Sequence, residues 1–208
     1  MPAASASPVQ RIELWGRSWE SYQAFLALQQ ERSPRISFDD GWLEVMVCSI
    51  EHEEPSQTLA AIVATVAEEA GIDFEPAGRP TIQRAHLKKG FEPDAAFYFT
   101  HLDRMRKPRF KPNELPAPDL TIEVDLTSDS RPRLGIFAAV GVPEVWRFSN
   151  GDLEFLTLLD GAYRPATRSQ WLPSLTAKTV MRWLKQREQM SRLAWLKSIR
   201  TWTRRNAG

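Results

Sequence analysis

The chain has 208 residues, of which 42% are hydrophobic and 25% charged, and it contains one cysteine. These values are typical of a globular protein with a sizeable core, and no apolar run approaches the roughly 20 residues of a membrane-spanning helix. The single cysteine, Cys48, excludes an intramolecular disulfide and a cysteine-rich zinc site. The composition therefore predicts a cytoplasmic protein with no membrane partner.

The net charge of +1 conceals an uneven distribution along the chain. Residues 178–208 carry nine Lys or Arg and one acid, a net charge of +8, whereas the rest of the chain carries −7. A basic tail can bind the phosphates of nucleic acid, but it can also be the solvated face of a helix. Its tryptophans fit either stacking on bases or packing against the body of the protein. Both interpretations stay open.

The first half of the chain begins with residues 1–12, which lack the basic and apolar regions of a signal peptide and predict a disordered lead. Apolar residues at helical spacing predict a short helix over residues 18–30. Two runs of β-type residues flank the turn Asp-Asp-Gly and predict a hairpin over residues 36–48. A longer helix follows, with Pro55 in its first turn and Gly71 as its stop.

The second half alternates between strand and helix patterns. The expected elements are strands at 72–75, 81–84, 94–99, 119–125, 144–148 and 153–158, a helix at 134–140, and helices from 175 onward with a break near 190. A basic, proline-rich loop occupies residues 104–118. This order predicts one mixed α/β domain over residues 13–175 and a basic helical C-terminal appendage over residues 176–208.

The strand at residues 119–125 carries acidic residues at alternate positions. Its apolar residues point to one face, and the other face carries Asp119, Glu123 and Asp125. Asp94 enters an earlier apolar strand, and Arg133 opens the next helix. One or two carboxylates beside a cation suit a divalent metal ion and a phosphate. Alternatively, Glu123 and Asp125 lie on a solvated sheet face and pair with arginines.

Five motifs together resemble the Uma2 family, which is assigned to the PD-(D/E)XK nuclease superfamily. They are DGWLEVM (40–46), EHE (51–53), GFEPDAAFY (90–98), APDLTIEVDLTS (117–128) and IFAAVGVPEVWR (136–147). The last is the most specific, and the resemblance covers about residues 18–205. It implies a restriction-endonuclease-like core, in which a central mixed β-sheet is flanked by helices.

The resemblance also implies roles for individual residues. Asp94 and Glu123 would be the two metal-binding acids, for Mg²⁺ or Mn²⁺. The lysine that usually follows the second acid by two positions is replaced here by Asp125, and Arg133 takes the place of a cation on the following helix. Arginine stays protonated, so Arg133 could bind phosphate but could not act as a general base.

Two residues near the start of the longer helix complete the candidate catalytic set. Glu53 matches a helix acid that organises metal-bound water in some of these nucleases, and Glu54 is an alternative by a one-residue shift. His52 has a suitable intrinsic pKa for moving protons, but it can equally pair with the neighbouring glutamates. Gln83, on the strand before Asp94, is a further candidate for the same site.

The sequence thus predicts a metal-dependent endonuclease that hydrolyses DNA phosphodiester bonds. Cleavage of both strands needs two sites, so a homodimer is expected. The alternative is a catalytically inactive protein of nuclease fold that serves as a nucleic-acid-binding or interaction module. The replacement of lysine by Arg133 favours this alternative.

Overall fold

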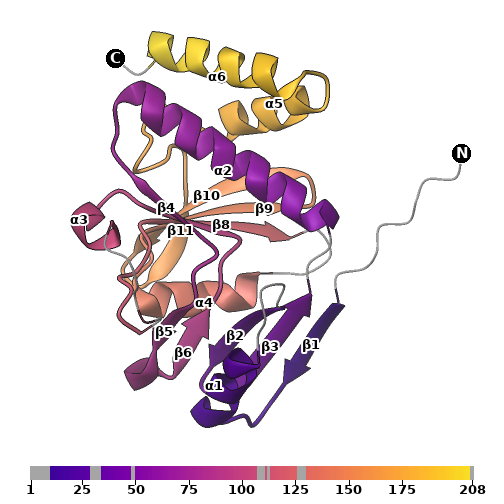
Figure 1. Cartoon of the computed structure of the whole chain (residues 1–208), viewed down its shortest axis with the longest axis vertical. Helices are drawn as coiled ribbons and strands as arrows, with labels where there is room; N and C mark the ends of the chain where they lie inside the picture. The colour runs from indigo at the N-terminus through magenta and orange to yellow at the C-terminus, as the bar shows by residue number, and fades with distance from the viewer. Residues whose placement is uncertain are drawn as a thin grey trace, which may run out of the picture.

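The computed structural model describes residues 10–28, 34–47, 50–106, 111, 113–125 and 130–206. Within these residues the chain forms two β-sheets, the helices α1 to α6 and one short 3-10 helix (Figure 1). The fold is the mixed α/β architecture that the sequence predicts. Among these residues, no helix is both long and apolar enough to cross a membrane.

The larger sheet is mixed and has six strands. Its order is β11 (Ala162–Ala166), β10 (Asp152–Leu159), β9 (Glu144–Ser149), β8 (Leu120–Asp125), β7 (Ala95–Tyr98) and β4 (Glu75–Gly78). Among the described strands of this sheet, only β8 and β9 pair in parallel. Parallel neighbours need a crossover connection, and α4 (Arg131–Val140) lies within it. Gly141 then ends α4 in the left-handed conformation, with φ of 88°.

The central strand β8 is buried along its whole length. Its apolar residues join the core cluster that contains α2 (Ile50–Ala70), as the alternating pattern predicts. The opposite face, with Glu123 and Asp125, is also buried. The alternative that these two acids lie on a solvated sheet face is therefore wrong, because α4 and the second sheet cover that face.

The smaller sheet is antiparallel and has five strands. Its order is β1 (Gln10–Leu14), β3 (Trp42–Val47), β2 (Arg35–Asp39), β6 (Lys89–Phe91) and β5 (Ile82–Arg84). The predicted hairpin is β2–β3, and its turn places Asp40 and Gly41 at positive φ. Strand β1 includes residues 10–12, which the sequence assigned to a disordered lead; residues 1–9 lie outside the described residues.

The helices form layers around the sheets (Figure 1). Helix α2 covers one face of the six-stranded sheet, and α5 (Ala177–Arg187) and α6 (Arg192–Asn206) pack on it. Helix α4 lies on the other face, between the two sheets, and α1 (Trp19–Ala27) covers the smaller sheet. Trp183 and Trp195 are buried in the same cluster as the sheet. The tryptophans of the C-terminal helices therefore pack on the body of the protein.

Two further local predictions were wrong. Pro55 lies inside α2, which begins at Ile50, rather than in the first turn. The strand expected at residues 72–75 is β4, which begins only at Glu75. The short helix α3 (Leu102–Met105) extends by two residues into the stretch predicted as a loop from residue 104. The remaining described element is the 3-10 helix at Ala85–Leu87.

Candidate active site

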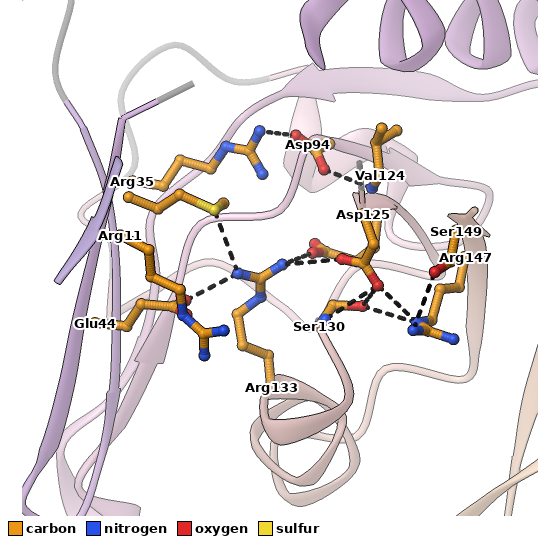
Figure 2. A network of polar contacts seen from close by, with 12 residues as sticks. Arg11, Arg35, Glu44, Asp94, Val124, Asp125, Ser130, Arg133, Arg147 and Ser149 are labelled. Carbon is orange, nitrogen blue, oxygen red and sulfur yellow. Dashed lines mark hydrogen bonds and ion pairs between the residues drawn. The ribbon is translucent and has the colours of Figure 1, made fainter. Parts of the chain in front are cut away.

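Strand pairing brings Asp94 beside Glu123. Asp94 directly precedes β7, which pairs antiparallel with β8, and its backbone amide donates to the carbonyl of Ile122 at 3.1 Å. Its carboxylate Oδ2 in turn accepts from the amide of Val124 at 2.8 Å (Figure 2). These two hydrogen bonds hold Asp94 against the backbone on either side of Glu123, as expected for paired acids on neighbouring strands.

Arg133 projects from the first turns of α4 into the space between the two sheets. Its Nη1 lies 2.8 Å from Glu44 Oε2 on β3, and its Nη2 lies 2.7 Å from Glu123 Oε2 on β8. Asp125 Oδ1 is more distant, at 3.8 Å from Nη2. The guanidinium, 2% exposed, is thus a planar fork that joins one carboxylate from each sheet (Figure 2).

Further arginines surround the same acids. Arg35 pairs with Asp94, Arg11 lies 2.5 Å from Glu44, and Arg147 donates to Asp125 at 2.8 Å. Ser130 donates both its amide and its hydroxyl to Asp125. We call this group the acid–arginine cluster, and its charged members among the described residues are Glu44, Asp94, Glu123, Asp125, Arg11, Arg35, Arg133 and Arg147 (Figure 2). Four arginines therefore balance four carboxylates.

Burial dominates the electrostatics of the cluster. It raises the pKa of Glu123 to about 7, although the positive charge of Arg133 opposes the shift. Asp94 and Asp125 add to the rise, because like charges nearby disfavour a second negative charge. Burial also opposes the charge on Arg133, but Glu123 and Glu44 outweigh it and raise the pKa of Arg133. Arg133 is therefore permanently charged, whereas Glu123 titrates near neutral pH.

The donor set fits a small divalent cation in part. Among the described residues, Glu123 Oε1 is buried without a hydrogen-bond partner, and so is Thr121 Oγ1 on the same face of β8. Mg²⁺ prefers oxygen ligands and often takes only one or two carboxylates. Against this, Glu123 Oε2 and Asp94 are already paired with Arg133 and Arg35. Among the described side chains, no three His, Cys, Asp or Glu converge as a metal-binding group.

A small cavity lies beside the cluster. It has a volume of about 270 Å³ and is lined by Arg131, Arg147, Ser149, Asn150, Asp152, Leu153 and Glu154. Arg147 links this cavity to Asp125, because its guanidinium contacts both. The carboxylates themselves are buried, with Asp94 4% and Glu123 0% exposed. Direct contact between a phosphodiester and these acids therefore requires neighbouring side chains to move.

The remaining predicted residues are placed less fully. His52 and Glu53 lie in the first two turns of α2, but their side chains are outside the described part of the structure. Glu54, the alternative to Glu53, is exposed. Gln83 accepts a hydrogen bond from Gln23 of α1 at 3.0 Å, which directs it to that helix.

The sequence did not identify Glu44, Arg11, Arg35 or Arg147 as members of the site. Three of them come from the smaller sheet, and Glu44 is separated from Arg133 by 89 residues. One signal was present: Glu44 is an acid within the apolar strand WLEVMV. A charged residue in such a strand needs a buried partner.

Comparison with known proteins identifies the family. The family model Uma2, described as "Putative restriction endonuclease", matches residues 19–186. The chain belongs to the Uma2 family. A crystal structure described as "a putative nuclease belonging to DUF820", from Anabaena variabilis, superposes on this chain with a TM-score of 0.55. It is 15% identical and covers 78% of this chain and 98% of its own, so the similarity shows the fold alone. No curated protein matches the chain.

Membership of Uma2 and the shared fold confirm the resemblance that the motifs indicated. The family description names an endonuclease, so phosphodiester hydrolysis is the activity that the family suggests. In this Uma2 protein the succession of β8, α4 and β9 places Arg133 at the centre of the acid–arginine cluster.

Proposed function

We propose that this Uma2 protein is a metal-dependent endonuclease that hydrolyses phosphodiester bonds in DNA. The observation that carries the proposal is the pair Asp94 and Glu123, held together on neighbouring strands, with Glu123 Oε1 buried and without a hydrogen-bond partner in the described part of the chain. A buried carboxylate oxygen without a partner is costly, and a bound cation would remove that cost. Family membership supports the same chemistry.

In this proposal Asp94 and Glu123 hold Mg²⁺ or Mn²⁺. When bound, such an ion polarises the phosphate and activates water for attack. Asp94 must release Arg35 for this, because an arginine and a divalent cation compete for one carboxylate. Arg133 keeps Glu123 oriented, and its permanent charge means that it contributes no general base. His52 and Glu53 stay predicted members of the site.

Asp125 acts on Arg147 rather than on the metal. Its Oδ2 accepts from Arg147 Nε and from Ser130, so that carboxylate oxygen is occupied. Arg147 also lines the adjacent cavity together with Arg131. A phosphate that enters this cavity would meet two guanidinium groups next to Asp125. Asp125 and Arg147 therefore position substrate in this proposal.

A second function, a catalytically inactive nucleic-acid-binding or interaction module, is favoured by one observation. The four carboxylates of the acid–arginine cluster are already balanced by four arginines in a buried network. Such a network can serve to join the two sheets without any catalytic role. The two functions differ in whether Asp94 is needed for cleavage or only for stability.

Cleavage assays distinguish the two functions. Purified protein is incubated with plasmid and single-stranded DNA in Mg²⁺, in Mn²⁺ or in EDTA, beside Asp94→Asn and the control Asp103→Asn, whose side chain is fully exposed. The proposal predicts cutting that needs metal, is lost in Asp94→Asn and is retained in the control. Absence of cutting by folded wild-type protein would favour the binding module.

The quaternary structure and location of the protein are also predictions. A homodimer would supply two sites for cleavage of both strands. Size-exclusion chromatography with light scattering measures the mass directly, and a monomer at working concentration would contradict the homodimer. The cytoplasmic location can be checked by fractionation of cells that express the protein.

A further inference from the structure

Helix α5 carries a row of three exposed cations. Lys178, Arg182 and Lys185 follow one another at spacings of four and three residues, which places them on one face of the helix. We call them the α5 basic stripe. At a rise of about 1.5 Å per residue the stripe extends over roughly 10 Å. This length is comparable with a few successive phosphates of a nucleic-acid strand.

The charge of the stripe is not compensated within the described residues. Helix α5 contains no acidic residue, and none of the three cations forms an ion pair with a described side chain. The next helix behaves differently: in α6, Arg200 lies 3.5 Å from Glu68, and Arg204 pairs with Glu69. Two of the cations of α6 are thus paired with acids of α2, whereas the three cations of the stripe have no acidic partner among the described residues and lie in one row.

The opposite face of α5 is used for folding. Val180 and Trp183 are buried in the main core cluster, and the helix contacts α2, α6 and β10. A helix that lies in a lipid interface needs a free apolar face, and α5 has already buried its own. The stripe thus offers charge without exposed apolar anchors, which suits a hydrophilic polyanion.

The surroundings of the stripe can also donate hydrogen bonds. A hollow of about 490 Å³ is lined by the three cations together with Thr179, Met181, Gln186 and Gln189. Hydroxyl and amide side chains contact phosphate oxygens in many nucleic-acid complexes, beside Lys and Arg. Arg182 additionally lies over the ring of Trp183, with its Cζ 6.0 Å from the ring centroid. This contact restrains the guanidinium at the surface.

From these observations we infer that the α5 basic stripe binds the sugar–phosphate backbone of a nucleic acid. The stripe is distinct from the acid–arginine cluster, because α5 packs on the α2 side of the six-stranded sheet and α4 lies on the other side (Figure 1). Binding there does not require catalysis, so the inference goes beyond the proposed nuclease activity.

The salt dependence of binding tests the inference. The affinity for a fluorescent DNA duplex is measured by anisotropy over a range of KCl concentrations, in EDTA so that cleavage cannot occur. Replacing Lys178, Arg182 and Lys185 together by Gln should weaken binding. If each cation neutralises one phosphate, the slope of log K against log[salt] should become shallower by about 3. The stripe is exposed, so the variant should keep the circular dichroism spectrum of the wild type.

The matched control removes the same charge from α6. Arg192, Lys197 and Arg205 are exposed, and their spacing does not place them in one row. Their joint replacement by Gln should leave the slope nearly unchanged. Equal losses in both triple variants, or no loss in the α5 variant, would overturn the inference. Poly-glutamate and single-stranded DNA of equal charge are also compared as competitors of the duplex. If poly-glutamate competes equally well, the inference is overturned, since the partner would then be an acidic polypeptide.

The outcome is separable from the nuclease proposal. Binding that depends on the stripe, without any cleavage, would support the stripe and reject the nuclease. Metal-dependent cleavage, together with a salt slope that is the same in the wild type and the α5 variant, would support the nuclease and reject the stripe.

Discussion

Replacing Arg133 by Met tests the electrostatic account of the acid–arginine cluster. The change removes the fork between Glu44 and Glu123 but keeps an unbranched side chain of similar length. Glu44 retains Arg11, whereas Glu123 loses the guanidinium that lay 2.7 Å from its Oε2 and stays fully buried. Loss of one partner of a buried ion pair costs about 3–5 kcal/mol. We expect a loss of that size in the free energy of unfolding at neutral pH.

The penalty should also depend on pH. Burial raises the pKa of Glu123 to about 7, and Arg133 restrains the rise, so removal of Arg133 raises the pKa further. A carboxyl whose pKa is higher in the folded state stabilises the fold at low pH, and that stabilisation is lost as the pH rises through the folded pKa. In the variant the free energy of unfolding keeps falling above pH 7, whereas in the wild type the contribution of Glu123 has already been lost at that pH. The loss in the free energy of unfolding caused by Arg133→Met should therefore be larger at pH 8.5 than at pH 6.

Urea unfolding, followed by tryptophan fluorescence at both pH values, measures these quantities. Arg131→Met is the matched control, because Arg131 lies on the same helix and is exposed; it should change the stability by less than about 0.5 kcal/mol. Adding Glu123→Gln to Arg133→Met should recover part of the loss. A loss below about 1 kcal/mol, equal at both pH values, would refute the reasoning.

Three further predictions concern single residues. Between pH 5 and pH 8 the wild type should lose stability relative to Glu123→Gln, because only the wild type carries the Glu123 carboxyl, whose pKa burial raises to about 7; a constant difference in urea unfolding would contradict this. Gly90→Ala should destabilise by about 1–3 kcal/mol, because its Cβ would lie 2.2 Å from the hydroxyl of the buried Tyr22; an unchanged melting temperature would be the contrary result. Gly135→Ala, the same change in the interior of α4 with open space around it, should instead stabilise by about 0.5–1 kcal/mol, and a lower melting temperature would contradict that.

Local sequence patterns predicted much of the fold. The alternating residues of β8, the turn at Asp40 and Gly41, and the break between α5 and α6 all follow from short-range chemistry. Strand β1 escaped prediction because its five residues, QRIEL, carry only a weak pattern. It is an edge strand that is defined by its pairing with β3, which is a long-range interaction.

The candidate site was predictable only in part. Spacing and motif placed Asp94, Glu123 and Arg133 in one region, and the structure brings all three into the acid–arginine cluster. The partners Glu44 and Arg35 were missed because the packing of one sheet against another is not encoded in the spacing of either. Pairing of the acids with arginines was foreseen as an alternative, but in a solvated setting. Burial changes the electrostatics of that pairing, because it raises the pKa of Glu123 toward neutral pH.

The proposed nuclease activity requires that Asp94 and Glu123 together bind a divalent metal ion. Electron paramagnetic resonance measures free Mn²⁺ directly, so the protein can be titrated with Mn²⁺ in the wild-type form and as Asp94→Asn and Glu123→Gln. The account predicts one bound Mn²⁺ per chain in the wild type and loss of that binding in both variants, with folding confirmed by circular dichroism. Absence of binding in the wild type, or binding that both variants retain, would contradict it.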